Sequence, residues 1–434
     1  MTIKGQLDTQ GHARVMVALR PNKKRSLEGG FMVSLSETID LQQQVAKDLS
    51  KHFKRFANSR AALLGKDFEA FLVKHKQTRE VAVEAGAEGV PPSPKVTYFP
   101  NLGVMLGTVD EAGLAALKAD RKRVGKVVAS PDFSLIPPVT ESALAGPAPG
   151  VSWALSRLKI PALWEKGLHG EGVLIGHLDT GVDPTHPALA GKIDAFAEFD
   201  FLGQRMTNSI TRDTRYHGSH TAGLLVGAPV GGVTFGVAPG AKLASSIVIE
   251  GGDIPARVLG GLDWCVGQGV RVVNLSLGLP GHDDEFSVIL TLLRQRNILP
   301  VVAIGNEGPQ TSRSPGNLPE SLSVGAFDEL DEIWLSSSSE QMAGPPARTA
   351  PVLIAPGVGL FSSVPGGGLR ALSGTSMATP HIAGLAALLV QYRPDLPIQK
   401  IEEAIIASCK RPSAISSLRG NHGAPDALEA YGRL

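Results

Sequence analysis

The stretch VLIGHLDTGVD, residues 173–183, begins as a run of apolar residues and ends in a turn that carries acidic side chains. Similar short apolar runs recur along the chain, at residues 243–249, 270–275, 299–304, 322–327 and 352–355. Strands that are apolar on both faces are typical of parallel sheets covered by helices on each side. The sequence therefore predicts an α/β fold with a parallel sheet flanked by helices.

Segments of helical character alternate with these runs, at residues 256–266, 283–296, 379–392 and 398–408. In folds of this kind, ligands and chemistry are found beyond the carboxyl ends of the parallel strands. Polar residues that follow a predicted strand, or that open a neighbouring helix, are therefore the first candidates for a functional site.

Three polar residues occupy such places. Asp179 follows the first apolar run in HLDTGVD, His217 opens a predicted helix in YHGSHTAGLLVG, and Ser376 precedes a long apolar helix in SGTSMATPHIAGLAALL. Serine alone is a poor nucleophile; it needs an imidazole to take its proton and a carboxylate to hold that imidazole in the correct tautomer. The three residues together predict an activated serine nucleophile.

A fourth residue fits the same chemistry. The predicted strand at 299–304 is followed by GNEG, which contains the side-chain amide of Asn306. An amide donor and the backbone N–H of Ser376 can stabilise the oxyanion of a tetrahedral intermediate. The chain order Asp, His, Ser and the absence of GxSxG around Ser376 exclude the α/β-hydrolase and chymotrypsin-like arrangements.

Residues 151–434 resemble a complete subtilisin-like serine protease (subtilase) domain. HLDTGVD, HGSHTAG, GNEG and GTSMATPH are similar to the family's Asp, His, oxyanion-Asn and Ser motifs. The resemblance implies an endopeptidase that needs no cofactor and cleaves a protein or peptide substrate through an acyl-enzyme. In it, Asp179 orients His217, His217 is the general base and acid, Ser376 is the nucleophile and Asn306 is the oxyanion donor.

The resemblance also implies substrate-binding residues. The strand that pairs with the substrate backbone corresponds to Ser276, Leu277 and Gly278, and such edge-strand addition reads peptides with little sequence demand. Ala303 and Glu307 correspond to the pocket for the residue before the scissile bond.

The chain differs from many subtilases in the residues at the position of a calcium site. Ala188 and Val230 stand where the family's high-affinity calcium site has oxygen-bearing side chains, so we expect no calcium at that site, although calcium elsewhere stays possible. The histidines His177, His220 and His381 are interpreted as core residues or as residues that pack behind the catalytic ones, without a catalytic or metal-binding role of their own.

The two cysteines, Cys265 and Cys409, are interpreted as small buried residues because they lie in apolar helical contexts. Two cysteines cannot form a disulfide framework or a four-cysteine zinc site.

The first part of the chain has a different character. Strands are predicted at residues 14–19, 96–99, 103–109 and 124–130, helical patterns occur at 32–56 and 61–76, and Asp110 is placed to cap a helix. The proline- and glycine-containing stretch TESALAGPAPG, residues 140–150, is typical of a linker. We therefore expect a smaller α+β domain over residues 1–144, followed by the catalytic domain over 145–434.

Residues 96–138 resemble the end of a subtilase propeptide. The resemblance implies a domain that assists folding and then inhibits, as an intramolecular partner, with its tail in the active site until it is cut. We place the autoprocessing cut between Leu144 and Ala145 in the linker. The segment 23–94 has no counterpart in the family propeptide, and a permanently attached domain of unrelated function is the alternative interpretation.

Charge and hydropathy limit partners and location. Lys plus Arg is 42 and Asp plus Glu is 41, so the net charge of +1 argues against a broad grip on nucleic acid or an anionic membrane. No apolar run is long enough to span a membrane, and no secretory signal is visible. We expect a soluble monomer that is cytoplasmic as synthesised, with signal-independent secretion left open.

Two other functions remain as alternatives. The first is a catalytically silent pseudoprotease that uses the cleft to hold peptides. The second is a peptide macrocyclase, which would need inserted elements that shield the acyl-enzyme from water; the interval between His217 and Ser376 leaves no room for a large insertion.

Overall fold

The computed structural model describes residues 2–20, 35–56, 95–140, 146–200, 203–249, 252–343 and 347–434. The chain divides into two compact units. Unit 1 comprises Met1–Asp132, Phe199–Met206 and Gly251–Trp264, and unit 2 comprises Phe133–Glu198, Thr207–Glu250 and Cys265–Leu434. The candidate catalytic residues all belong to unit 2.

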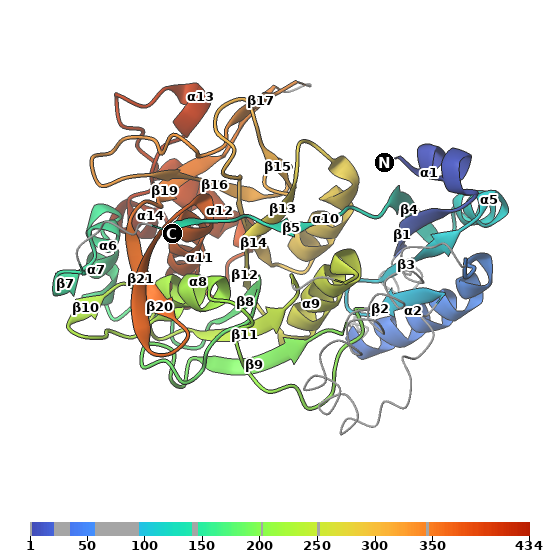
Figure 1. Cartoon of the computed structure of the whole chain (residues 1–434), viewed down its shortest axis with the longest axis horizontal. Coiled ribbons are helices and arrows are strands. Elements are labelled where there is room, and N and C mark those ends of the chain that lie inside the picture. Colours follow the sequence, from blue (N-terminus) through green and yellow to red (C-terminus); the bar gives the residue numbers. More distant parts are fainter. Residues whose placement is uncertain are drawn as a thin grey trace. The chain divides into compact units, whose positions relative to one another are not determined.

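Unit 2 is built around a seven-stranded sheet in the order β19-β16-β14-β12-β8-β11-β9, and every pair of neighbours is parallel (Figure 1). The strands are β8 (Leu174–Asp179), β9 (Ile193–Glu198), β11 (Lys242–Ile247), β12 (Val272–Leu275), β14 (Leu299–Ala303), β16 (Leu322–Phe327) and β19 (Leu353–Pro356). The predicted parallel sheet is confirmed, and each predicted strand is present within two residues of its expected ends.

One strand of this sheet escaped the sequence analysis. β9 reads IDAFAE and its first four residues are exposed or half-buried. It lies at the edge of the sheet, next to β11 alone, so it needs no continuous apolar run.

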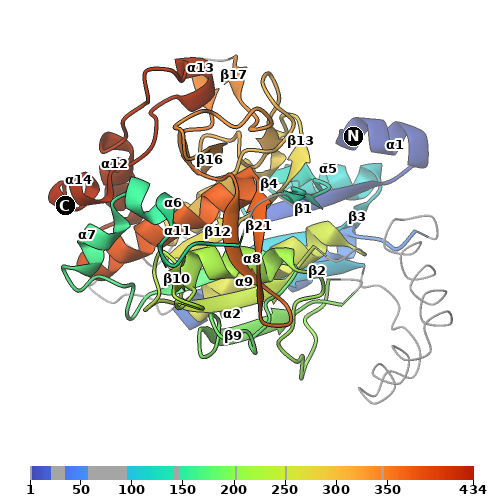
Figure 2. The same cartoon turned by 60° about the vertical axis from the view of Figure 1, so that its left-hand side comes forward.

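Helices flank the sheet. α11 (Thr375–Tyr392) packs on β12, β14, β16 and β19 and lies beside α8 (His217–Val226), as Figure 2 shows. Residues 375–390 of α11 are all buried, which explains why this helix is apolar on every side. The expected start at residue 379 was wrong: the helix begins at Thr375, so Ser376 lies in its first turn.

The remaining helices of the described chain are shorter or more exposed. α9 (Ile254–Gln268) connects β11 to β12, α10 (Ser287–Gln295) packs on β14 after the 3₁₀ turn η3 (Asp284–Phe286), and α12 (Ile398–Ala407) packs on α11. Short helices are α6 (Trp153–Arg157), α7 (Ile160–Trp164), α13 (Ser417–Gly420) and α14 (Ala427–Gly432).

Small sheets lie outside the main sheet of unit 2. β5 (Ser134–Leu135), β13 (Leu277–Pro280) and β15 (Arg313–Ser314) form one, and β6 (Val139–Thr140), β21 (Gly368–Ser373) and β20 (Leu360–Val364) form another. Two-stranded pairs are formed by β7 (Gly150–Val151) with β10 (Val233–Thr234) and by β17 (Glu340–Met342) with β18 (Arg348–Ala350).

Unit 1 contains a four-stranded antiparallel sheet in the order β2-β3-β1-β4. Its elements are α1 (Ile3–Gln10), β1 (Ala13–Leu19), α2 (Leu35–Leu49), η2 (Ser50–His52), β2 (Val96–Phe99), β3 (Val104–Val109), α5 (Glu111–Ala119) and β4 (Val124–Ala129). The four predicted strands are confirmed. Asp110 Oδ1 accepts the N–H of Gly113 at 2.8 Å, which confirms the predicted cap of α5. The helix expected at 61–76 lies outside the described residues.

Within unit 1, the antiparallel sheet and the first part of α9 share polar contacts. Asp263 accepts the backbone N–H of Leu102 at 2.8 Å and the side-chain amide of Asn101, and Asp253 pairs with Arg14. These bonds join residues that are distant in the sequence, and they explain why Gly251–Trp264 is grouped with the N-terminal strands.

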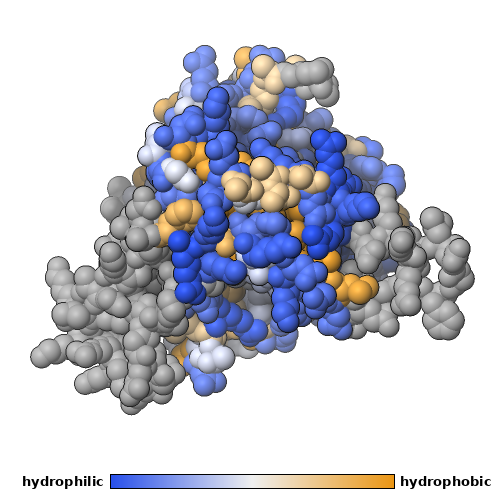
Figure 3. All heavy atoms as spheres, turned by 90° about the vertical axis from the view of Figure 1, so that its right-hand side faces the viewer, coloured by the Kyte–Doolittle hydropathy of each residue, from blue (hydrophilic) through white to orange (hydrophobic). Residues whose placement is uncertain are grey.

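No helix in the described part of the chain is long and apolar enough to cross a membrane. Figure 3 shows the face that lies at the right-hand side of Figure 1, where the coloured residues are mostly hydrophilic and the hydrophobic ones form small groups. The coloured part of this face therefore offers no broad apolar surface.

Two buried histidines with lowered pKa values make the stability of the fold depend on pH. Burial lowers the pKa of His220 to about 3 and that of His381 to about 4, against an ordinary value near 6.5. At pH values between the lowered pKa and the ordinary pKa, these histidines bind protons in the unfolded chain but not in the folded chain, so acidification favours unfolding. We expect the free energy of unfolding to fall as the pH is lowered from about 6.5 to about 4.

Urea unfolding at a series of pH values measures this dependence. His381→Gln removes one of the two groups and should give a shallower slope over the same pH range. An identical slope in wild type and variant would contradict the assignment.

Candidate active site

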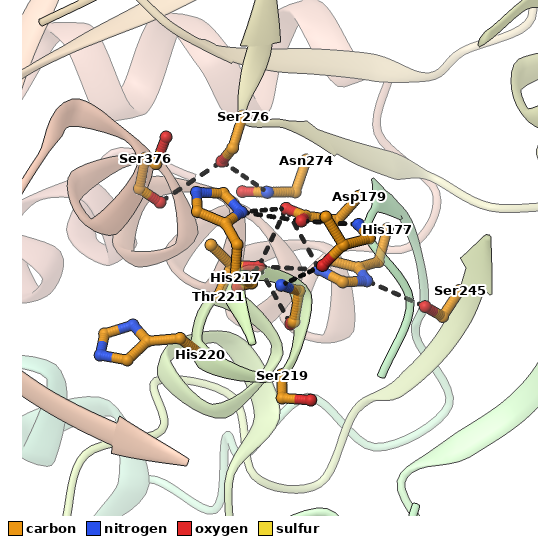
Figure 4. A network of polar contacts seen from close by, with 12 residues as sticks. His177, Asp179, His217, Ser219, His220, Thr221, Ser245, Asn274, Ser276 and Ser376 are labelled. Atoms are coloured by element: carbon orange, nitrogen blue, oxygen red, sulfur yellow. Dashed lines mark hydrogen bonds and ion pairs between the residues drawn. The ribbon is translucent and has the colours of Figure 1, made fainter. Parts of the chain in front are cut away.

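The main sheet and two helices bring the predicted acid, base and nucleophile together. Asp179 is the last residue of β8, His217 is the first residue of α8, and Ser376 is the second residue of α11. All three are buried. Figure 4 shows the imidazole of His217 between the carboxylate of Asp179 and the side chain of Ser376.

The contact between Asp179 and His217 is a hydrogen-bonded buried pair. His217 Nδ1 donates to Asp179 Oδ1 at 2.7 Å and lies 2.9 Å from Oδ2, and the backbone N–H of Thr180 also donates to Oδ1 at 2.7 Å. Burial alone would raise the pKa of the Asp179 carboxyl, but His217 and these donors lower it below its usual value. The carboxylate therefore stays charged and fixes the proton of His217 on Nδ1.

A glycine allows this close approach. A Cβ at Gly218 would lie only 2.0 Å from the carbonyl oxygen of Gly181, in the turn that follows Asp179. The backbone N–H of Gly218 also donates to Thr180 Oγ1 at 2.9 Å. The start of α8 therefore contacts the end of β8 directly, which brings His217 within reach of Asp179.

Asn306 is held with its amide N–H₂ directed at an acceptor. Its Oδ1 accepts both the backbone N–H and the hydroxyl of Thr375 at 2.9 Å, while its Nδ2 donates to the carbonyl of Pro137 at 2.9 Å. Thr375 is the residue before Ser376, so the amide donor and the serine are tied to the same turn of α11.

A segment of the chain itself, residues 134–140, runs through this site. β5 pairs antiparallel with β13, where Leu135 lies opposite Leu277 and Ser134 lies opposite Gly278. β6 pairs antiparallel with β21, which ends at Ser373, shortly before Ser376. In the structure, the strand predicted to bind substrate backbone, which begins at Ser276, pairs with this segment of the same chain.

Ser376 and Asn306 contact different residues of this segment. Ser376 Oγ donates to the carbonyl of Ile136 at 3.3 Å, and the backbone N–H of Ile136 donates to the carbonyl of Ser276 at 3.4 Å. Asn306 Nδ2 instead holds the next carbonyl, that of Pro137. The hydroxyl and the amide therefore contact two adjacent carbonyl groups.

Glu307 is part of an ion pair that the sequence analysis missed. Arg313 donates to Glu307 Oε1 from Nε at 2.8 Å and from Nη2 at 2.6 Å, and its Nη1 donates to the carbonyl of Gly278 and to Ser134 Oγ. Burial opposes ionisation of Glu307, but Arg313, the backbone N–H of Asn306 and the hydroxyl of Ser338 together lower the pKa of that carboxyl. Ala303, the other predicted pocket residue, is fully buried at the end of β14. The sequence signal for the ion pair with Glu307 was Arg313, which follows GNEG by a few residues.

The residues at the family's calcium position do not fit a calcium site. Ala188 is fully buried in an apolar cluster with Val233 and Phe235, and Val230 packs against the same cluster. Calcium needs oxygen ligands, and these side chains supply none. Among the described residues there is no group of three or more His, Cys, Asp or Glu that could hold a metal ion.

The parallel α/β fold and the Asp–His–Ser arrangement define a serine hydrolase of the subtilisin type. Residues 170–431, more than half of the chain, match the model of the Subtilase family, and the chain belongs to that family. Subtilisin BL and Subtilisin Savinase, both from Lederbergia lenta, are each 36% identical over 249 residues, which cover 57% of this chain and 87% of each relative. Subtilisin E of Bacillus subtilis (strain 168) is 30% identical over 351 residues, covering 78% of this chain and 85% of the relative. The protein is a subtilisin-like serine endopeptidase.

Both thiols lie in surroundings that favour their protonated form. Burial raises the pKa of Cys265, and burial together with Glu429 raises the pKa of Cys409 to about 12. A protonated thiol is a poor nucleophile. We expect iodoacetamide at pH 8 to leave the folded protein active and both cysteines unmodified, as peptide mass mapping would show.

The matched control is the same reaction in urea, where both cysteines should be alkylated. Rapid alkylation of the folded protein with loss of peptidase activity would contradict this expectation.

Proposed function

We propose that Ser376 is the nucleophile, that His217 is the general base and acid, and that Asp179 orients and charge-stabilises His217. The single observation that carries this proposal is the position of the His217 ring, hydrogen-bonded to Asp179 on one side and facing Ser376 on the other (Figure 4). The same arrangement argues against the alternative of a catalytically silent peptide-binding protein.

The reaction follows from the placement of these groups. Ser376 Oγ attacks a peptide carbonyl while His217 Nε2 takes its proton, and the oxyanion accepts hydrogen bonds from Asn306 Nδ2 and the backbone N–H of Ser376. His217 then gives the proton to the leaving amine, and water activated by His217 releases the acyl group from the serine. No metal or cofactor takes part in these steps.

The substrate binds as an added strand in this proposal. Its backbone pairs with Ser276, Leu277 and Gly278, as residues 134–136 do in the structure. Ala303 and Glu307 line the pocket for the residue before the scissile bond. Arg313 closes part of this pocket through its ion pair with Glu307.

Residues 134–140 act as an intramolecular inhibitor. They occupy the strand-pairing positions that a substrate needs, and Ile136 is fully buried beside Ser376. Attack requires the serine and the oxyanion donor to act on one carbonyl, whereas here they contact the carbonyls of Ile136 and Pro137. The fixed φ of Pro137 hinders the rotation that would bring the Ile136 carbonyl to Asn306.

The protein is made as a zymogen in this proposal, with residues 1–144 as the inhibitory and folding domain and 145–434 as the catalytic domain. The cut between Leu144 and Ala145 lies outside the described residues. Support comes from the ordered segment that precedes it in the active site and from the linker composition of residues 140–150.

Replacement of the nucleophile tests activity and maturation together. We expect wild type to yield two fragments split near residue 145, and Ser376→Ala to remain a single chain with peptidase activity lower by about 10⁴-fold or more. Intact mass spectrometry and hydrolysis of a peptide substrate measure the two results. A processed Ser376→Ala chain, or an intact wild type that hydrolyses peptides freely, would contradict the proposal.

Replacement of the proline tests the inhibitory register. In Pro137→Ala the φ of residue 137 is free, so the carbonyl of Ile136 can reach the oxyanion donor and the segment should become a substrate. We expect a new cleavage between residues 136 and 137, detected by mass spectrometry.

Pro138→Ala is the matched control, because it changes the neighbouring proline but keeps Pro137 and its fixed φ next to the Ile136 carbonyl. It should give the wild-type fragments. Identical fragments from Pro137→Ala and wild type would show that the proline does not protect the bond.

A further inference from the structure

His177 is a buried polar residue that the proposed reaction does not use. It lies in β8, two residues before Asp179, and its side chain is fully buried. Its Nδ1 is 2.9 Å from Ser245 Oγ on β11, and its Nε2 is 2.9 Å from Thr221 Oγ1 on α8. A buried imidazole costs free energy unless its polar atoms are satisfied, and both are satisfied here.

These contacts lead to the catalytic carboxylate. Thr221 Oγ1 lies 3.3 Å from Asp179 Oδ2, and His177 Nε2 lies 4.0 Å from the same oxygen. Figure 4 shows His177 and His217 on opposite sides of Asp179. Ser245, His177 and Thr221 thus form a continuous row of polar groups that ends at Asp179.

The proton positions in this row follow from the charge on Asp179. Thr221 has one hydroxyl hydrogen, and the oxygens within reach are Asp179 Oδ2 and the carbonyls of His217 and Gly218. The hydrogen bond to the carboxylate is favoured because it is assisted by a full charge. Thr221 must then accept the N–H of His177 Nε2, which leaves His177 Nδ1 to accept the hydroxyl of Ser245.

A neutral His177 is required for this arrangement, because a doubly protonated ring could not accept from Ser245. Burial lowers the pKa of His177, and the nearby His217 lowers it further. The charges of Asp179 and Asp213 raise the pKa, but the net shift is downward. The imidazole is therefore neutral at pH 7.

We propose that His177 and Thr221 are positioning residues for catalysis: Ser245 fixes the tautomer of His177, His177 makes Thr221 a donor, and Thr221 holds Asp179 Oδ2 against rotation while His217 Nδ1 is bound. The proposal rests on the proposed role of Asp179 as the residue that orients His217. It gives a specific role to a histidine that the sequence alone placed only in the core or behind the catalytic residues.

Thr221→Val tests the last link, because valine keeps the shape of threonine and removes its hydroxyl. We expect kcat for a peptide substrate to fall about tenfold, the size of one hydrogen bond to a charged group, with KM changed less than about twofold. Thr221→Ser keeps the hydroxyl and should restore kcat. Rates are normalised to the fraction of Ser376 that a fluorophosphonate labels.

The pH profile separates positioning from a packing defect. Without the Thr221 donor the Asp179 carboxylate is a stronger partner for protonated His217, so the acidic limb of kcat/KM should move to higher pH. Thr221→Val should show this shift and Thr221→Ser should not.

Ser245→Ala tests the first link and has a matched control. It removes the group that fixes the tautomer of His177, and we expect kcat to fall about threefold. Ser246→Ala changes the next residue of β11, whose buried hydroxyl has no hydrogen-bond partner among the described residues, and should leave kcat unchanged.

The outcomes are distinguishable. Wild-type kcat and an unshifted acidic limb in Thr221→Val, failure of Thr221→Ser to restore kcat, or equal effects of Ser245→Ala and Ser246→Ala would overturn the positioning role while the proposed function stands. If the fluorophosphonate does not label Ser376 in wild type, the proposed function fails and this inference fails with it.

Discussion

The buried carboxylate of Asp179 is the constraint on which the rest of the site depends. A charge in the interior is tolerated only when it is paired and hydrogen-bonded. Here His217, the backbone of Thr180 and the hydroxyl of Thr221 lie around it. The fold supplies these partners because the end of β8 lies against the start of α8. The absence of a side chain at Gly218 allows the two backbones to come into contact.

The second constraint is the backbone edge of β13, which can pair with an added strand. β13 pairs with β15 on one side and with β5, part of residues 134–140, on the other. Under the proposed mode of substrate binding, a site that pairs with peptide backbone can take up a segment of its own chain as well as a substrate. In the proposed inhibition, control depends on register: the serine and the amide of Asn306 contact successive carbonyls, so a strand can occupy the site without being cleaved.

The fold and the central residues were predictable because their signals are local. Buried parallel strands are apolar along their length, and Asp179, His217, Asn306 and Ser376 each lie in a short distinctive motif. β9 was missed because an edge strand needs no apolar run. The pairing of Arg313 with Glu307, the register of residues 134–140 and the row that ends at Asp179 depend on distances between elements far apart in the chain, which no local pattern records.

The central claim is that Asp179 and His217 activate Ser376 and no other serine. The most direct measurement is reaction of the folded protein with a serine-directed fluorophosphonate, followed by peptide mass mapping. We expect one adduct, on Ser376, which forms faster once residues 134–140 have left the site and is abolished in unfolded protein. An adduct on a different serine, or none on folded protein whose site is free of that segment, would contradict it.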